Sequence, residues 1–192
     1  MARTYRLKRR AERQNETRER IVEAAVELHT TLGPARTSIV AIAERAGVER
    51  PTVYRHFPTT EALFTACTGH HWAQHPPPDP EPWLQISDPA ERMRRGLGEL
   101  YAHYASLEST LWVIHRDFED MPEIRRFGHR NVRHRKRVIE VLADAWPHLS
   151  APKLHAVLGH AIDFFAWRSL RRQGLSNDQA AELMIELAQN VR

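Results

Sequence analysis

Residues 37–57 read TSIVAIAERAGVERPTVYRHF, and this stretch indicates two short helices joined by a tight turn. Apolar residues recur through its first half at the spacing of one helix face, and the hydroxyl of Thr37 can cap that helix. Gly47 is expected to end it, because glycine adopts the left-handed backbone found just past a helix end. A second helix is predicted to begin near Arg50.

The second helix is predicted to have an inward and an outward face. Pro51 suits its first turn, and Val53 and Phe57 fall one turn apart on the inward side. The outward residues are Arg50, Thr52, Tyr54, Arg55 and His56. Cations and hydroxyl groups in this arrangement can contact base edges and phosphates in a DNA major groove. The stretch therefore predicts a helix-turn-helix with a recognition helix; the alternative is an ordinary corner of two helices with a solvated charged face.

The flanking sequence extends this pattern. Residues 15–66, NETRERIVEAAVELHTTLGPARTSIVAIAERAGVERPTVYRHFPTTEALFTA, resemble the TetR family of dimeric bacterial transcriptional repressors. The shared features are a first helix with Ile21, Ala24, Ala25 and Leu28 inward, a break at Gly33, the AERAGV turn, the YRHF ending and the EAL that opens the next helix. The rest of the chain resembles the family only in its length and helical pattern.

The resemblance also suggests DNA contacts at the edges of the motif. We assign them to Thr37 and Ser38 before the first helix of the pair and to Thr60, which stands where family members usually carry a lysine. Val40 and Ala41 replace a polar pair common in the family and receive no DNA contact.

A basic segment precedes the motif. Residues 1–20 hold eight Arg and Lys against three Glu and so carry 8 − 3 = +5, whereas the formal net charge of the whole chain is +4 and the rest of it is close to neutral. We expect residues 1–13 to form an arm that is disordered without DNA and that contacts phosphates or the minor groove, with Arg9 and Arg10 among the contacts. The alternative is a solubilising tail.

Composition agrees with a small helical domain followed by a larger one. The chain has 192 residues, of which 42% are apolar, and no apolar run long enough to cross a membrane, so we expect a cytoplasmic protein without a signal segment. Cys67 is the only cysteine, which excludes an internal disulfide and favours a buried filler over a redox sensor. Histidines at 70, 71 and 75 lack a recognised ligand pattern, so no metal or other cofactor is expected.

Further helices are predicted beyond the motif. One should run from Thr59 or Thr60 to about His75, and five prolines between Pro76 and Pro82 should then form a stiff connection. The later helices should begin at Asp88, near Leu111, at Asp120, at Ser150 and at Ser176, with Pro147 ending the third and Gly174 the fourth.

The last two predicted helices are apolar on more than one face. A helix that is apolar all round must be buried all round, so one face needs a partner. We predict a homodimer formed by these helices, as the family resemblance also implies. The interface residues are predicted to be Leu158, Ile162, Phe165, Met184, Leu187 and Val191; the alternative is a fully internal helix pair.

Polar residues on otherwise apolar helix faces suggest a ligand cavity. Small-molecule pockets are mostly apolar with a few placed polar groups. The predicted lining is Tyr101, Tyr104, Trp112, His115, Phe118, Asn131, Arg135, Asp163 and Trp167. A flat or lipophilic inducer is favoured by the aromatic groups, and Arg135 would favour an acid or carbonyl group.

The sequence therefore predicts an all-α protein with three parts: the arm (1–13), a helix-turn-helix domain (14–60) and a ligand-binding and dimerisation domain (61–192). We expect a non-enzymatic transcriptional repressor that binds a palindromic double-stranded DNA operator as a homodimer and is released by a small molecule. An enzyme and a ligandless nucleoid protein are the alternatives. Against an enzyme, the sequence contains no phosphate loop, no nucleophile elbow and no paired-carboxylate motif.

Overall fold

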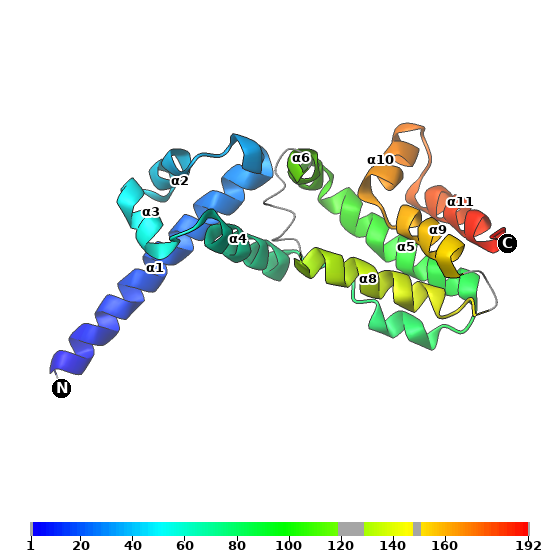
Figure 1. Ribbon diagram of the computed structural model, residues 1–192, viewed down its shortest axis with the longest axis horizontal. Helices are drawn as coiled ribbons and strands as arrows, with labels where there is room; N and C mark the ends of the chain where they lie inside the picture. The colour runs from blue at the N-terminus through cyan, green and yellow to red at the C-terminus, as the bar shows by residue number, and fades with distance from the viewer. Residues whose placement is uncertain (1, 119–128, 148–150, 192) are drawn as a thin grey trace. The chain divides into compact units, whose positions relative to one another are not determined.

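The computed structural model describes residues 2–118, 129–147 and 151–191, and within them it is all helical (Figure 1). This confirms the predicted fold class. The helices are α1 (Ala2–Thr31), η1 (Pro34–Arg36), α2 (Ile39–Ala46), α3 (Arg50–His56), α4 (Thr60–Gln74), η2 (Glu81–Gln85), α5 (Pro89–Ser106), α6 (Glu108–Phe118), α8 (His129–Ala143), α9 (Ala151–Ala161), α10 (Phe164–Arg172) and α11 (Asn177–Gln189).

The chain divides into two compact units. The first contains Met1–Pro76 and Ser109–Phe127, and the second contains Pro77–Glu108 and Gly128–Arg192. The sequence placed a boundary near residue 60, whereas α4 and most of α6 lie in the first unit. The reason is packing: α4 lies against α1, where the ring of His29 stacks on Phe64 with centroids 4.7 Å apart.

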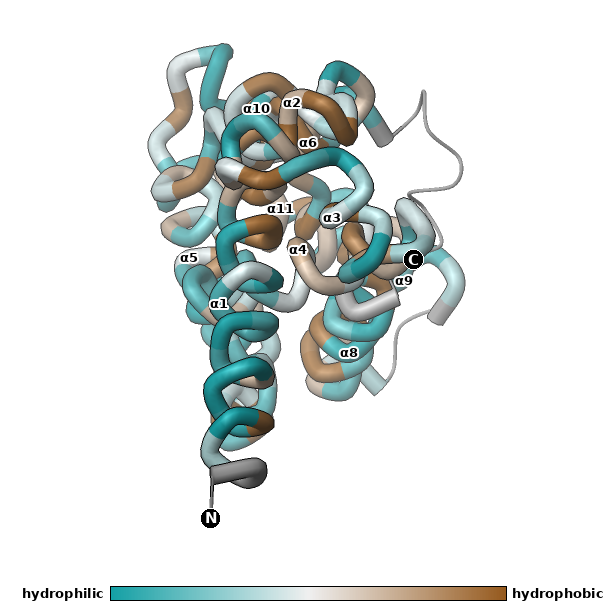
Figure 2. Tube along the Cα trace, turned by 90° about the vertical axis from the view of Figure 1, so that its left-hand side faces the viewer, coloured by the Kyte–Doolittle hydropathy of each residue, from teal (hydrophilic) through white to brown (hydrophobic). Residues whose placement is uncertain are grey.

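The first unit has its core between α1, α2, α3 and α4. Ile21, Ala25 and Val53 are fully buried there, and Ile42 and Leu63 are nearly so. Burial of each large aliphatic side chain contributes roughly 1.5–3 kcal/mol. The N-terminal turns of α1 extend beyond this core and are mostly hydrophilic (Figure 2). They continue α1 without a break, whereas the sequence predicted a separate, disordered arm.

The turn between α2 and α3 forms as predicted. Gly47 adopts the left-handed backbone at φ 64°, and Pro51 lies in the first turn of α3. The cap of α2 differs from the prediction, because Ser38 accepts the bond from the Ala41 N–H at 3.1 Å. Thr37 instead donates its hydroxyl to the Gly33 carbonyl at 2.8 Å, which fixes η1 before α2.

The second unit is organised around α5, which begins at the predicted Asp88 cap and packs on α11. Trp83 of η2 is buried and donates its indole N–H to Glu99 at 3.0 Å. The buried guanidinium of Arg92 donates to the carbonyls of Leu84, Ile86 and Val141. The proline-rich connection is therefore anchored at its far end by side chains of α5.

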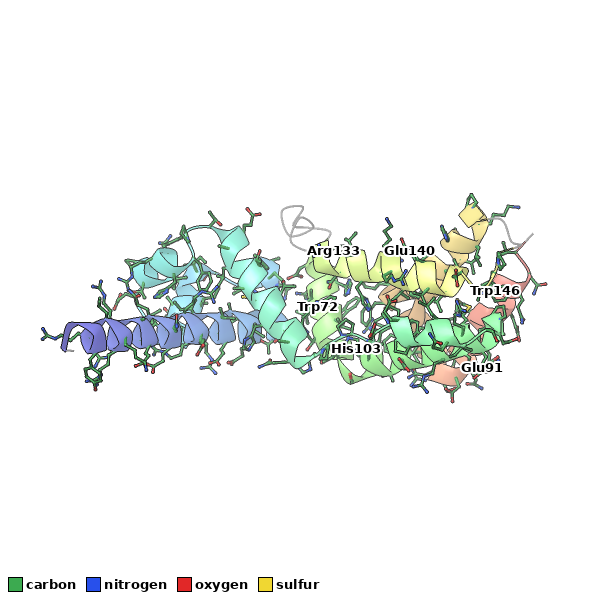
Figure 3. The ribbon with its side chains drawn as sticks, turned by 90° about the horizontal axis from the view of Figure 1, so that it is seen from below. Trp72, Glu91, His103, Arg133, Glu140 and Trp146 are labelled. Carbon is green, nitrogen blue, oxygen red and sulfur yellow. The ribbon has the colours of Figure 1, made fainter. Side chains whose placement is uncertain are left out.

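Salt bridges tie the surface of α8 together. Glu140, labelled in Figure 3, pairs with Lys136 at 3.7 Å and with Arg137 at 3.6 Å, and Arg137 also pairs with Glu81 before Trp83. The predicted start of this helix at Asp120 lies outside the described residues. The helix ends at Ala143, earlier than predicted, and the backbone N–H of Trp146 then donates to the Ala143 carbonyl at 2.9 Å.

The predicted helix from Ser150 to Gly174 is wrong, because the structure divides it into α9 and α10. Asp163 lies at the break, with extended backbone, and its carboxylate accepts from the N–H groups of Phe165 at 2.9 Å and Ala166 at 3.1 Å. A short acidic side chain competes with the helix for backbone bonds in this way. The start at Ser150 lies outside the described residues. The last helix begins at Ser176 as predicted, where a capping box with Gln179 is complete.

Candidate nucleic-acid interface

The recognition helix predicted from sequence corresponds to α3. Its inward face is confirmed, because Val53 is 0% and Phe57 3% exposed. On the outward side Arg50, Pro51, Tyr54 and Arg55 are exposed, and Thr52 and His56 are half-buried. The helix thus presents a polar, cationic surface while two apolar side chains fix it to the core.

Two neighbouring side chains on α3 are held together before any partner binds. The Arg50 guanidinium lies over the Tyr54 ring, 5.5 Å from its centroid, and donates to the Tyr54 hydroxyl at 3.2 Å. Stacking on an aromatic ring restricts an arginine without removing its donors for a bidentate contact. Arg50 is therefore available to contact a base edge from a restricted position.

The predicted contacts around α3 occupy different environments. Ser38 and Thr60 are exposed, at the start of α2 and of α4, whereas Thr37 is half-buried. Ser38 accepts a backbone bond, but its hydroxyl proton is available to a phosphate. Thr59, the other candidate cap, holds the start of α4 by accepting from the Ala62 N–H at 3.1 Å.

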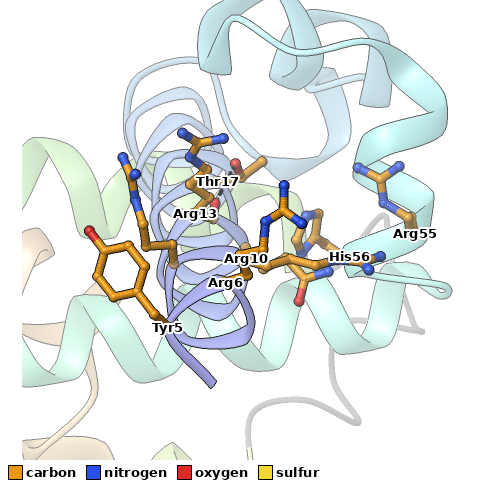
Figure 4. A pocket seen from close by; sticks show the side chains of 9 residues that line it. Tyr5, Arg6, Arg10, Arg13, Thr17, Arg55 and His56 are labelled. Carbon is orange, nitrogen blue, oxygen red and sulfur yellow. Dashed lines mark hydrogen bonds between the residues drawn. The ribbon is translucent and has the colours of Figure 1, made fainter. Parts of the chain in front are cut away.

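A groove lies between the N-terminal turns of α1 and the end of α3, with a volume of about 870 Å³ (Figure 4). We call it the α1–α3 groove. Its lining residues are Tyr5, Arg6, Arg9, Arg10, Arg13, Gln14, Thr17, Arg55 and His56. Five of these nine are arginines and none is acidic, so the groove suits an extended anion.

The α1 contribution to the groove follows from helical spacing. Residues 2–20 contain neither glycine nor proline and are rich in good helix formers. Arg6, Arg10, Arg13 and Thr17 then recur at intervals that place them on one helix face. The sequence prediction named Arg9 and Arg10, but it treated the segment as disordered and so missed this face; the same spacing could have indicated it.

His56 lines the groove from the end of α3. Burial lowers the pKa of His56, and the charges of Arg55 and Arg18 lower it further. Arg18 is itself fixed over the Phe57 ring, 4.9 Å from its centroid. A neutral imidazole among guanidinium groups is a site whose protonation a bound anion would favour.

The end of α6 contacts the loop before α2, which sequence reasoning did not anticipate. The buried Asp117 carboxylate accepts from the Ala35 N–H at 3.0 Å and from Arg116 at 2.7 Å. Arg116 also donates to the Leu32 carbonyl at 3.0 Å. Gly33 lies against this pair with φ 102°, and a Cβ added there would overlap the Asp117 carboxylate. These contacts hold the end of α1 in position ahead of α2.

Several predicted cavity residues lie in a closed core. A side chain that lines a water-filled cavity keeps some solvent-accessible surface. Tyr101 is 0% and Trp167 is 1% exposed, so neither side chain lines such a cavity. Tyr101 donates to the Ala161 carbonyl at 2.8 Å, Tyr104 to the Ile162 carbonyl at 2.8 Å, and Trp167 to Asn177 at 3.1 Å. Burial accordingly raises the pKa of Tyr104 to about 12. The cavity assignment is corrected for Tyr101 and Trp167, whose polar groups bond to the fold itself.

Other predicted cavity residues are at the surface. Asn131 is exposed, and Arg135 and Asp163 form a partly exposed pair at 3.7 Å, with side chains 43% and 39% exposed. Arg135 also donates to the Gly159 and Ile162 carbonyls at the end of α9. The expected buried carboxylate is therefore an exposed helix cap. Trp112 and His115 are half-buried on α6, and the side chain of Phe118 lies outside the described residues.

The predicted dimer residues separate into two groups. Leu158, Ile162 and Met184 are at most 3% exposed and belong to the chain's own core, which corrects their assignment. Phe165 and Leu187 are 40% and 48% exposed, and Leu183, not predicted, is 36% exposed. Val191 is half-buried. An apolar surface thus remains on α10 and α11.

The structure also bears on three features considered from the sequence: the single cysteine, a metal site and a membrane span. Cys67 is buried, and burial raises the pKa of its thiol to about 12, so the reactive thiolate does not form at neutral pH. Among the described residues, no three His, Cys, Asp or Glu side chains gather as a metal site. None of the described helices is long and apolar enough to span a membrane.

The fold and the exposed face of α3 define a helix-turn-helix protein. The sequence model described as "Bacterial regulatory proteins, tetR family" matches residues 21–67. An HTH-type transcriptional regulator of Mycobacterium tuberculosis is 41% identical over 54 residues. This match spans 28% of this chain and 29% of that protein.

Solved structures extend the similarity of fold to most of the chain. A TetR-like transcriptional regulator from Rhodococcus sp. RHA1 is 22% identical, with 90% of this chain and 93% of that chain covered and a TM-score of 0.59. RolR, solved with its ligand resorcinol, is 21% identical, with 92% and 89% covered and a TM-score of 0.51. The chain thus matches the tetR family model over residues 21–67, and its fold resembles that of TetR-like regulators over most of its length.

Proposed function

We propose that this protein is a transcriptional repressor that binds a palindromic DNA operator as a homodimer and is released by a small molecule. The outward face of α3 carries the proposal: Arg50, Tyr54 and Arg55 are exposed together on a helix whose other face is fixed in the core. Such a helix fits a major groove, where arginine donates to guanine and hydroxyl groups contact phosphates.

The proposed dimer would place two such helices on one operator. The exposed Phe165, Leu183 and Leu187 supply an apolar surface on two adjacent C-terminal helices. A two-fold axis through this surface would pair each helix with its copy, and the operator would then have two matching half-sites.

Release by a small molecule is supported by the family and by one structural neighbour. RolR has this fold and binds resorcinol. We propose that the inducer of this protein is likewise aromatic or lipophilic. Trp112 and His115 of α6, both half-buried, are the predicted lining residues that remain candidates.

A selection experiment tests the DNA-binding proposal directly. The purified protein is incubated with a random duplex library, and bound sequences should converge on an inverted repeat. Arg50→Ala should weaken binding by about 1–3 kcal/mol and relax the preference at one position of each half-site. Arg172→Ala is the matched control, because Arg172 is an exposed arginine on α10. Recovery of no preferred sequence by the wild type would contradict the proposal and favour a nucleoid protein.

A further inference from the structure

Two arginines in the middle of α1 contact the two ends of the helix-turn-helix. At the end of α2, the Arg20 guanidinium donates to the Ala46 carbonyl at 3.3 Å, beside the turn at Gly47. At the end of α3, the Arg18 guanidinium lies over the Phe57 ring, 4.9 Å from its centroid. One turn of α1 therefore reaches the ends of both helices of the motif.

The recognition helix is short and is held in place by packing. It has seven residues, and its N-cap residue, Glu49, forms no side-chain capping bond. A helix of this length is not stable alone, so contacts with the rest of the unit must hold it. Val53 in the middle of α3 and Phe57 at its end supply such contacts, since they are 0% and 3% exposed. The ring that Arg18 covers is thus one of the points that set the direction of α3.

The charge of Arg18 also acts on side chains around this end of α3. Burial, then the charge of Arg55 and then that of Arg18 lower the pKa of His56, the residue before Phe57. On α4, burial raises the pKa of Cys67, and the charge of Arg18 is among the smaller effects that oppose the rise. The stacking distance and these electrostatic effects agree in placing the guanidinium at the end of α3.

We propose that Arg18 is a positioning residue for DNA recognition: by covering the Phe57 ring it fixes the end of α3, and so sets the direction in which Arg50 and Tyr54 face the bases. A guanidinium is attracted to the face of an aromatic ring and stacks on it. Arg18 acts through this ring and not by contact with a phosphate. The inference rests on the proposed function and adds a residue of another helix to those that determine sequence preference.

The test separates positioning from a phosphate contact. Arg18→Gln removes the stacked cation, Arg18→Lys keeps a cation, and Arg172→Gln removes the same charge from the exposed surface of α10. Affinity is measured at several salt concentrations for the selected operator and for a duplex of scrambled sequence. Loss of a phosphate contact weakens binding to both duplexes alike and reduces the salt slope of log K by about 0.9, whereas a displaced α3 weakens binding to the operator alone.

The expected result is a loss of preference at constant salt slope. Arg18→Gln should lower the ratio of operator affinity to scrambled affinity by about fivefold or more, which corresponds to the smallest contribution of one bidentate base contact. Arg18→Lys should restore part of this ratio, and Arg172→Gln should match the wild type. An unchanged ratio for Arg18→Gln, equal losses on both duplexes with a reduced slope, or no recovery with lysine would each overturn the inference.

A second substitution tests whether the ring carries the effect. Phe57→Leu keeps an apolar side chain in the core but removes the ring face, and circular dichroism checks that this variant is folded. In the Phe57→Leu background, Arg18→Gln should change the ratio little, because residues that act through one contact are not additive. The same loss in both backgrounds would show that Arg18 acts elsewhere.

A readout without DNA uses the His56 imidazole. In an NMR titration Arg18→Gln should raise the pKa of His56, because one of the charges that lower it is removed, and Arg18→Lys should keep it low. An unmoved pKa in Arg18→Gln would show that the guanidinium does not lie at the end of α3, and would overturn the inference while leaving the repressor assignment intact. Failure of the wild type to select any operator would instead reject the proposed function.

Discussion

His56 lies half-buried where the α1–α3 groove meets the recognition helix. Burial and then the charges of Arg55 and Arg18 lower its pKa in the free protein. A phosphate in the groove would favour the imidazolium and raise this pKa. The complex should therefore take up a proton between the free and bound pKa values, and DNA affinity should rise as pH falls through that window.

This dependence can be measured by fluorescence anisotropy with a labelled operator at constant ionic strength. His56→Gln should flatten the curve of affinity against pH, since glutamine keeps a polar side chain but does not titrate. A variant with the wild-type curve would show that the proton is taken up elsewhere.

His29 is a second histidine with a shifted pKa, but its effect is on stability. It is 7% exposed and stacks on Phe64, and burial lowers its pKa to about 4 from 6.5. The folded state disfavours the charged ring, so its contribution to stability is complete above about pH 6.5 and is lost as pH falls toward 4, by roughly 3 kcal/mol.

Urea unfolding of the wild type and of His29→Leu at pH 7.5 and pH 4 checks this prediction. The wild type should lose roughly 3 kcal/mol more than the variant on acidification, because leucine has no proton to bind. The same loss in both proteins would assign the acid sensitivity to carboxylates instead.

At the scale of elements, the end of α6 is joined to the loop after α1. Only glycine fits at position 33, for two reasons. Its φ is 102°, which side chains disfavour, and an added Cβ would overlap the Asp117 carboxylate. Gly33→Ala should therefore destabilise the protein by several kcal/mol. Gly69→Ala is the matched control, because Gly69 lies in α4 of the same unit with nothing within 4 Å of its added Cβ. That change should stabilise by about 0.5–1 kcal/mol.

Thermal or urea unfolding distinguishes the two glycine variants by the sign of the change. Asp117→Ala should also destabilise, by roughly 2–4 kcal/mol, because the Ala35 N–H loses its acceptor. Wild-type stability for Asp117→Ala would show that the joint between α6 and the loop is unimportant.

Local signals explain which elements could be predicted. Gly47, Pro51 and the caps at Asp88 and Ser176 each act within a few residues, and the structure has them as expected. The break at Asp163 was missed because apolar residues continue at helical spacing on both sides of it. Periodicity alone cannot reveal that a carboxylate has replaced the helix bonds.

The candidate site shows the same limit. The outward face of α3 depends on one helix period and could be predicted, whereas the α1–α3 groove needs two elements that are distant in sequence. The cavity prediction failed at Tyr101 and Trp167 for a related reason: an apolar face with polar groups is equally typical of a closed core whose polar atoms bond to backbone carbonyls.

At the scale of the whole molecule, the exposed apolar surface on α10 and α11 predicts the state of assembly. Light scattering at micromolar concentration should report about twice 22.3 kDa. Leu187→Glu should give a folded monomer, because Leu187 is 48% exposed, whereas Met184→Glu should unfold the chain, because Met184 is 3% exposed. A monomeric wild type, or a Leu187→Glu variant that is still a dimer, would show that this surface is not the dimer interface.

The last prediction concerns the coupling of the two proposed ligands. If an aromatic or lipophilic inducer stabilises a conformation with weaker DNA affinity, linkage requires operator DNA to weaken inducer binding by the same factor. Candidate phenols and aromatic acids are titrated by tryptophan fluorescence, with and without operator, and DNA affinity is measured with and without inducer. Both ratios should agree, at about 5–150-fold for a coupling of 1–3 kcal/mol.

A variant can separate inducer binding from DNA binding in this scheme. Trp112 is half-buried on α6, the helix whose end holds the loop before α2 through Asp117. Trp112→Leu should weaken inducer binding without changing operator affinity in the absence of inducer. Because Arg135 bonds to the end of α9 and to Asp163 at the surface, Arg135→Gln should leave inducer affinity unchanged. A loss of inducer affinity confined to Arg135→Gln would place the inducer at the α9–α10 break instead of beside α6, because that arginine would then be a contact and not a cap.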